Sequence, residues 1–138
     1  MTDYNRSGSN TTWMARIRGP RQLGLKSMLI FKIVHRDEWA AAHGEYAGSA
    51  KDRADGFLHF STAEQIPSTL ARYYANAGDL VLVAVDADAL GAALKYEASR
   101  DGALFPHLYA PLPFSAAKWV RAITRDSKGA FVLPNEMV

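Results

Sequence analysis

The sequence of 138 residues contains no cysteine. This absence excludes thiol catalysis, cysteine-ligated zinc, iron–sulfur clusters and a disulfide framework. Long apolar runs are missing too, because the longest, residues 80–85, is far shorter than the roughly 20 residues that a transmembrane helix needs. We therefore expect a cytoplasmic protein that has no membrane-spanning helix.

Several familiar catalytic motifs are also absent. The sequence has no Walker-type phosphate loop, no G-x-G-x-x-G dinucleotide motif, no G-x-S-x-G nucleophile turn and no H-E-x-x-H zinc motif. Its four histidines, at positions 35, 43, 59 and 107, show no local metal-ligand spacing. We accordingly predict no metal site and no resident cofactor, and we keep NAD as a candidate substrate.

Positive charge is concentrated near the start of the chain. Residues 1–27 hold five Lys and Arg against one acidic residue, whereas the remainder is slightly acidic, within a formal net charge of +2. The remainder thus gives no general electrostatic reason to bind nucleic acid. Residues 1–27 are also poor in aliphatic side chains, so we expect a disordered tail, with Met28 as an alternative natural start. Residues 28–138 are expected to form a single domain.

Short strand and helix patterns alternate within residues 28–138. This mixture predicts an α+β domain with five or six strands and two helices. The unbroken apolar run at residues 80–85 is typical of a strand that is buried on both faces at the centre of a sheet. The expected strands cover residues 29–34, 57–61, 80–85, 94–98, 118–124 and 130–133, and the helices are expected to begin near residues 38 and 62.

The first candidate for a functional segment is the strand around His59. Alternation places His59 and Ser61 on one face of this strand, which ends at a helix N-terminus. Free amides at such a terminus favour an anion or a polar ligand oxygen, as in phosphate or ribose. The alternative is structural: Ser61 and Thr62 cap the helix, while His59 packs under Trp39 or Tyr73.

The second candidate segment runs from residue 96 to residue 109. The Phe105-Pro106 pair stiffens the chain before His107, and with Tyr109 it could form an aromatic wall for a base or a nicotinamide ring. The alternative is that these rings fill one end of the core. Glu97 would stabilise positive charge on a sugar ring if it faced the His59 cleft, and otherwise it is one member of a solvated strand face.

Two sequence blocks resemble a known family. They are Asp55-Gly-Phe-Leu-His-Phe-Ser-Thr62, followed by Gln65, and Leu104-Phe-Pro-His-Leu-Tyr109. These blocks, with Trp39 and Glu97, strongly resemble the small bacterial family named domain of unknown function 952, over about residues 29 to 124.

The family resemblance implies a fold similar to the ADP-ribosyltransferase-like group, which holds NAD or an ADP-ribosylated group between two small sheets. By that similarity, His59 and the Ser61-Thr62 pair match positions that contact ribose or support the sheet. Glu97 matches the carboxylate that engages the nicotinamide ribose. The resemblance therefore implies a split-sheet domain and ADP-ribosyl chemistry.

The sequence is consistent with three functions. The first is an enzyme of ADP-ribosyl or related nucleotide chemistry, with Glu97 and His59 as catalytic residues. The second is a module that binds a nucleotide or small metabolite without turnover, and the third is a metal-assisted hydrolase that uses His59 and His107. The expected partner is a small, nucleotide-like or ADP-ribose-like molecule, and neither nucleic acid nor membrane. The expected ligand-binding residues are Asp55, Ser61, Thr62, Gln65, Phe105, His107 and Tyr109.

Overall fold

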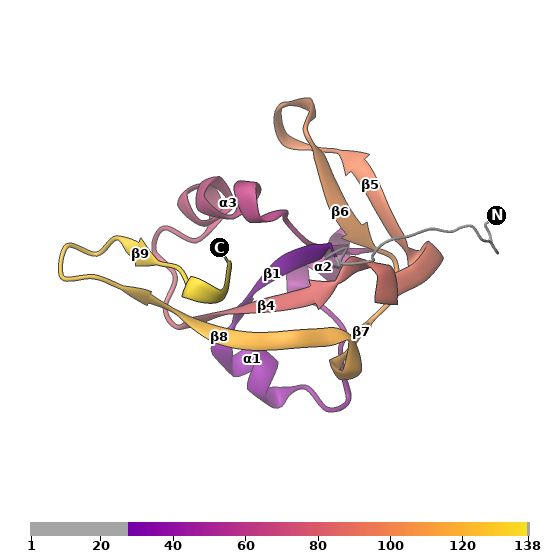
Figure 1. Cartoon of the computed structure of the whole chain (residues 1–138), viewed down its shortest axis with the longest axis horizontal. Coiled ribbons are helices and arrows are strands. Elements are labelled where there is room, and N and C mark those ends of the chain that lie inside the picture. The colour runs from indigo at the N-terminus through magenta and orange to yellow at the C-terminus, as the bar shows by residue number, and fades with distance from the viewer. Residues whose placement is uncertain (1–27, 138) are drawn as a thin grey trace, which may run out of the picture.

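A four-stranded antiparallel sheet forms one half of the protein (Figure 1). The computed structural model describes residues 28–137, so the tail expected at residues 1–27 lies outside the described residues. The strand order is β1-β4-β8-β9. These strands are β1 (Leu29–His35), β4 (Leu80–Asp86), β8 (Ala117–Arg125) and β9 (Phe131–Val132).

A second antiparallel sheet of three strands, in the order β3-β6-β5, supports the candidate site. Its strands are β3 (Leu58–His59), β5 (Leu94–Ala98) and β6 (Leu104–Leu108), while β2 (Glu45–Tyr46) and β7 (Leu112–Pro113) pair with each other. His107 lies opposite His59 on one side and opposite Lys95 on the other. Residues directly opposite in a sheet share a face, so this register brings the polar side chains of three strands together.

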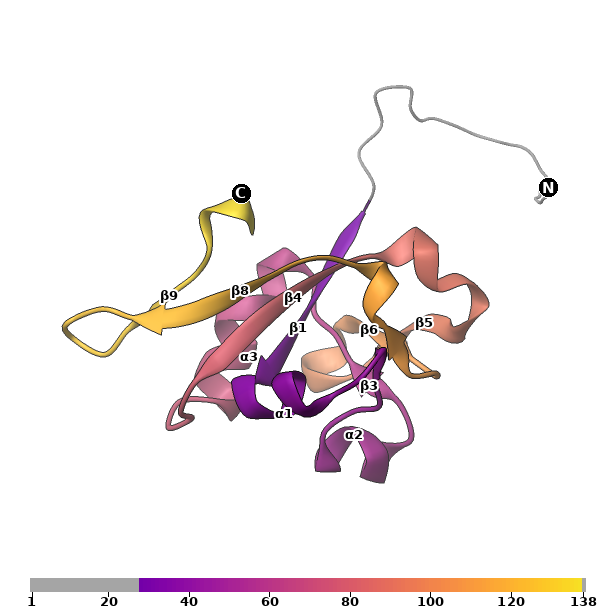
Figure 2. The ribbon, with the colours of Figure 1, turned by 90° about the horizontal axis from the view of Figure 1, so that it is seen from below.

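Helices cover the sheets on several sides (Figures 1 and 2). Within residues 28–137, no helix is long and apolar enough to cross a membrane. The α-helices are α1 (Arg36–Ala41), α2 (Ala50–Asp55) and α3 (Ile66–Tyr73), and the 3₁₀ helices are η1 (Ala63–Gln65), η2 (Ala87–Ala93), η3 (Arg100–Gly102), η4 (Phe114–Ala116) and η5 (Asn135–Met137).

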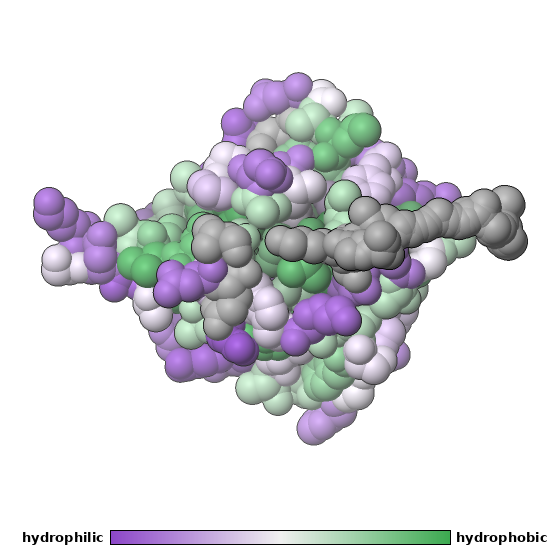
Figure 3. Space-filling view, viewed as in Figure 1, coloured by the Kyte–Doolittle hydropathy of each residue, from purple (hydrophilic) through white to green (hydrophobic). Residues whose placement is uncertain are grey.

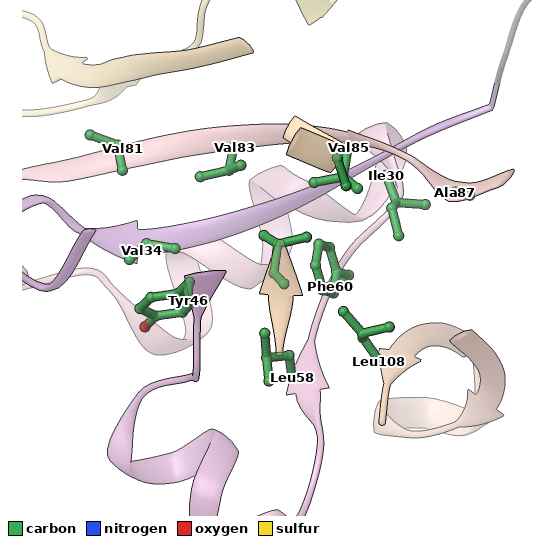
Figure 4. Close-up of a cluster of buried hydrophobic side chains, with 12 residues drawn as sticks. Ile30, Val34, Tyr46, Leu58, Phe60, Val81, Val83, Val85, Ala87 and Leu108 are labelled. Carbon is green, nitrogen blue, oxygen red and sulfur yellow. The ribbon is translucent and has the colours of Figure 1, made fainter. Parts of the chain in front are cut away.

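Strand β4 is buried on both faces, as its apolar run predicts. Its odd-numbered valines, Val81, Val83 and Val85, join a core that also contains Leu58 and Leu108 of the second sheet. Figure 4 shows these side chains between the two sheets. Its even-numbered residues pack into another core, to which α3 contributes Ile66 and Leu70.

The described residues hold more elements than expected, with nine strands and three α-helices. Strands β2, β6 and β7 and helix α2 were not predicted. Strand β6 contains Pro106, which lacks the N–H that a central strand normally uses. Pro106 is tolerated because its partner strand β3 ends at His59. Phe60, the next residue, donates its N–H to Pro106 O at 3.0 Å, and Pro106 has no N–H with which to return a second hydrogen bond.

Hydrophilic and hydrophobic residues are interspersed on the face shown in Figure 3. The hairpin of β5 and β6 carries two exposed large apolar side chains, Tyr96 and Leu104. Single exposed apolar residues are ordinary on protein surfaces and do not indicate a binding site. The buried polar groups of the protein are more informative, because such groups are uncommon.

Candidate functional site

A cavity of about 160 Å³ lies between β1, α3 and the second sheet. Each of these elements contributes polar or aromatic side chains to its wall. The residues around it include Lys32, Ser49, Lys51, Asp52, His59, Ser61, Thr69, Tyr73, Tyr74, Ser99, Phe105 and His107.

A buried ion pair forms one wall of this cavity. Lys32 is the single charged residue inside the apolar run of β1, and its side chain is 5% exposed. Its Nζ lies 2.9 Å from Oδ2 of Asp52, whose side chain is 2% exposed, and it also donates to His59 O at 2.8 Å. The Lys32 ammonium group is therefore held between β1, α2 and β3.

The N-terminal cap of helix α2 positions Asp52 beside Lys32. Ser49 caps the helix: Asp52 N donates to Ser49 Oγ at 3.1 Å, and Ser49 N donates to Asp52 Oδ2 at 2.9 Å. Gly48 precedes the cap at φ +112°, and a Cβ at this position would lie 2.8 Å from Asp52 Cβ. A glycine is thus required here both by the backbone conformation and by the close approach of Asp52.

His59 is bracketed by two carboxylates. Its Nδ1 lies 2.6 Å from Asp52 Oδ1, and its Nε2 lies 2.9 Å from Asp55 Oδ2. His59 N also donates to Asp52 Oδ1 at 3.1 Å. An ionised carboxylate only accepts hydrogen bonds, so both ring nitrogens carry hydrogen when both contacts are hydrogen bonds.

The charged states of Asp52, Lys32 and Asp55 depend on the groups around them. Burial by itself raises the pKa of Asp52, but the His59 hydrogen bond and the Lys32 charge hold that pKa well below its usual range. Burial lowers the pKa of Lys32, and the Asp52 carboxylate opposes this effect. A hydrogen bond from Lys51 lowers the pKa of Asp55. Both carboxylates that face His59 are therefore set to remain ionised.

A second carboxylate–histidine pair lies on the neighbouring strands β6 and β5. His107 Nδ1 lies 2.8 Å from Glu97 Oε1, and the same oxygen accepts a 2.8 Å hydrogen bond from Tyr109 OH. The hydrogen bonds from His107 and Tyr109 lower the pKa of Glu97. The His107 side chain is 6% exposed and that of Glu97 is 39% exposed. His107 is thus the buried member of this pair.

Aromatic contacts join the two histidines. The His59 and His107 rings meet edge to face with centroids 5.7 Å apart. Phe57 stacks on His107 at 4.0 Å and also contacts Tyr109 at 5.2 Å. Burial raises the pKa of Tyr74 at the cavity wall to about 12, so this phenol keeps its proton at neutral pH.

The structure brings some of the expected site residues to the cavity directly and others through a neighbour. His59, Ser61, Phe105 and His107 line the cavity. Of the expected residues outside the cavity wall, Asp55 contacts His59. Glu97 contacts His107, and Tyr109 donates a hydrogen bond to Glu97.

Thr62 and Gln65 have structural contacts. Thr62 N donates to Gln65 Oε1 at 3.0 Å, and Gln65 Nε2 donates to Leu104 O at 2.8 Å, so Gln65 ties the start of α3 to β6. The structural alternative packed His59 under Trp39 or Tyr73: Trp39 instead packs on Tyr46 and Phe114, whereas Tyr73 lines the same cavity as His59.

Sequence reasoning missed Lys32 and Asp52. One signal was a lone lysine inside a strand of otherwise apolar residues, since buried charges are rare unless they are paired. The other was the Ser49-x-x-Asp52 spacing of a capping box, which marks a helix start. Within residues 28–137, no three His, Asp or Glu side chains form a group that could hold a metal ion.

Comparisons with known proteins show the family to which the chain belongs. The crystal structure of protein CC0527 from Caulobacter crescentus is 46% identical, with a TM-score of 0.74, and the match covers 79% of this chain and 97% of that one. The solution structure of the same protein is 49% identical, with a TM-score of 0.64 over 73% of this chain and 89% of that one. No protein among those with curated descriptions matches the sequence. Residues 33–120 match the family described as "Protein of unknown function (DUF952)", and the chain belongs to that family.

Proposed function

We propose that the protein is an enzyme of ADP-ribosyl or related nucleotide chemistry that holds a ribosyl group in the cavity. The observation that carries this proposal is the convergence of two carboxylate-backed histidines and a buried Lys32–Asp52 pair on one small cavity. Clustered ionisable groups of this kind, set in a cleft, are typical of functional sites.

The lining of the cavity suits a sugar. Ser49, Ser61, Thr69 and Ser99 place hydroxyl-bearing side chains around it, and Tyr73 adds an aromatic ring. Pockets for drug-sized ligands occupy about 300–1,000 Å³. A cavity of about 160 Å³ therefore suits a pentose or a single ring, and the remainder of a nucleotide would extend beyond it.

His59 has the contacts of an acid–base residue. Asp52 fixes its orientation through Nδ1, as the orienting carboxylate does in other acid–base dyads. A hydrogen on Nε2, shared with the half-exposed Asp55, is the proton that His59 would give to a ligand oxygen. The family resemblance implied that Glu97 engages the sugar directly. In this proposal Glu97 acts instead through its contact with His107.

One observation favours the second function, a binding module without turnover. Both nitrogens of His59 already have partners in the protein, Asp52 and Asp55. A ligand must displace Asp55 before Nε2 can transfer a proton. If Asp55 stays in place, the same cavity binds a nucleotide and catalyses nothing.

A thermal-shift titration with NAD, ADP-ribose and AMP, followed by product analysis, separates these functions. A ligand that binds only the native state stabilises it by about 2.7 kcal/mol at 100-fold excess over Kd. We expect a rise in Tm with NAD and release of nicotinamide. A rise without product supports the binding module, and no rise with any of the three nucleotides contradicts both proposals.

His59→Asn tests the acid–base role. We expect it to lower the rate of nicotinamide release by about 10²- to 10⁴-fold, because a positioned acid or base contributes about that much. His43→Gln is the matched control, since His43 is exposed and outside the cavity wall. An undiminished rate in folded His59→Asn protein contradicts the assignment.

A further inference from the structure

Among residues 28–137, one of the two ring nitrogens of His107 has a hydrogen-bond partner and the other has none. Nδ1 is 2.8 Å from Glu97 Oε1, whereas Nε2 has no hydrogen-bond partner among residues 28–137. The side chain is 6% exposed, so bulk water does not readily satisfy Nε2. Buried polar atoms are rarely left unpaired, and each such atom in a native structure calls for an explanation.

Nε2 lies on the side of the His107 ring that faces the cavity. His107 lines the cavity and Glu97 does not. Phe57 stacks on one face of the ring at 4.0 Å and restricts its rotation. With Nδ1 directed at Glu97, Nε2 is the polar atom that His107 presents to a ligand.

The Glu97 carboxylate decides which nitrogen carries the hydrogen. Its pKa is lowered by the hydrogen bonds from His107 and Tyr109, so it remains ionised and accepts hydrogen bonds only. The hydrogen of a neutral His107 ring therefore lies on Nδ1. Nε2 is then bare and acts as an acceptor.

Lys32 presents the complementary group on the same cavity. An ammonium group has three N–H bonds, and in the described part of the chain those of Lys32 have two hydrogen-bond acceptors, Asp52 and His59 O, while the Phe60 ring centroid lies 5.7 Å from Nζ. One N–H is left at a side chain that is 5% exposed and lines the cavity. Within the part of the chain that the structure describes, the cavity thus offers an acceptor at His107 and an N–H at Lys32, neither of which has a hydrogen-bond partner.

We propose that Glu97 is a positioning residue that holds hydrogen on His107 Nδ1, so that the bare Nε2 accepts a hydrogen bond from a hydroxyl group of the ligand. A hydroxyl both donates and accepts, so ligand hydroxyls can satisfy Nε2 and the unused N–H of Lys32. The ligand class is a polyhydroxylated molecule such as a pentosyl group. This inference rests on the proposed function for its ligand, but its claim about Glu97 concerns the free protein.

Nitrogen-15 NMR of the histidine side chains of the full-length protein tests the inference. In the free protein we expect hydrogen on Nδ1 and a bare Nε2 in His107. Glu97→Ala is expected to lose this preference, while Glu97→Gln keeps it because the amide oxygen still accepts from Nδ1. Tyr109→Phe is the matched control, because it removes the other hydrogen bond to Glu97 and leaves the His107 contact.

Two results overturn the role of Glu97 in this proposal. One is hydrogen on Nε2 in the free protein, and the other is an unchanged tautomer in folded Glu97→Ala. ADP-ribose at saturation should then shift the Nε2 resonance, and saturable binding that leaves it unmoved contradicts the ligand contact. Failure of ADP-ribose to bind counts against the proposed function, whereas the free-protein spectra decide the role of Glu97 independently.

Discussion

Burial of Lys32 beside Asp52 removes two charges from water, and their attraction only partly compensates for the lost hydration. A buried ion pair is therefore weak evidence for stability and is better explained by a task at the cavity that both residues line. Asp52 also contacts Ser49 N, His59 N and His59 Nδ1, so with Lys32 Nζ one carboxylate holds four nitrogen atoms from three residues. At the scale of single residues, Asp52 is the centre of the site.

Asp52→Asn is expected to lower the free energy of unfolding by about 3–5 kcal/mol, because it leaves the Lys32 charge buried without a counter-charge. The measurement is urea denaturation. Asp79→Asn is the control, since its ion pair with Arg36 is exposed and such pairs contribute about 0–1 kcal/mol. Equal losses for the two variants contradict this account of the buried pair.

Acid should destabilise the protein through the same carboxylate. The folded-state pKa of Asp52 is held well below the unfolded value of about 3.9, so the unfolded chain takes up the proton first as the pH falls. Stability contributed by Asp52 is present above about pH 4 and is lost below it. Denaturation curves from about pH 6 to pH 3 should show a smaller decline for Asp52→Asn than for the unchanged protein, and parallel declines contradict the prediction.

At the scale of elements, the short helix α2 determines whether the site forms. The sequence pattern did not predict it as a helix, because its six residues carry no apolar stripe. Its signal is the Ser49-x-x-Asp52 box, preceded by a glycine that packs on Asp52. A helix defined by its cap and not by its hydrophobic face is difficult to predict from periodicity.

Gly48→Ala tests this role of α2. The new Cβ would lie 2.8 Å from Asp52 Cβ at a φ of +112°, so we expect a loss of about 1–3 kcal/mol and a displaced Asp52. Gly44→Ala is the matched control, because Gly44 also has a positive φ, of +73°, but has open space around it. Thermal unfolding of both variants makes the comparison, and a Gly44→Ala loss as large as that of Gly48→Ala contradicts the packing argument.

The strands that were predicted are those whose residues have a recognisable strand pattern. Strands β1, β4 and β8 were identified because β-branched and aromatic residues recur in them, and β5 because charged residues alternate with Leu94 and Tyr96 along it. Strand β6 was missed because Pro106 argues against a central strand, and its tolerance depends on where β3 ends. That information lies in the pairing of strands and not in the local sequence.

At the scale of the whole molecule, the cavity depends on how the two sheets meet. Backbone hydrogen bonds of 2.8 Å in both directions join Phe31 of β1 to Ser61, just beyond β3. This junction places Lys32 of the first sheet next to His59 of the second. The two histidine-containing blocks were predictable from their polar and aromatic content, but their convergence with Lys32 depends on tertiary structure.

We propose that a nucleotide-like ligand occupies this cavity and contacts both histidines that line it. The most direct measurement is a titration with ADP-ribose, followed through the side-chain NMR signals of His59, His107 and the exposed His43. We predict that the His59 and His107 signals move together with a single Kd while His43 stays unchanged. Absence of binding, or saturable binding that moves neither cavity histidine, would contradict the claim.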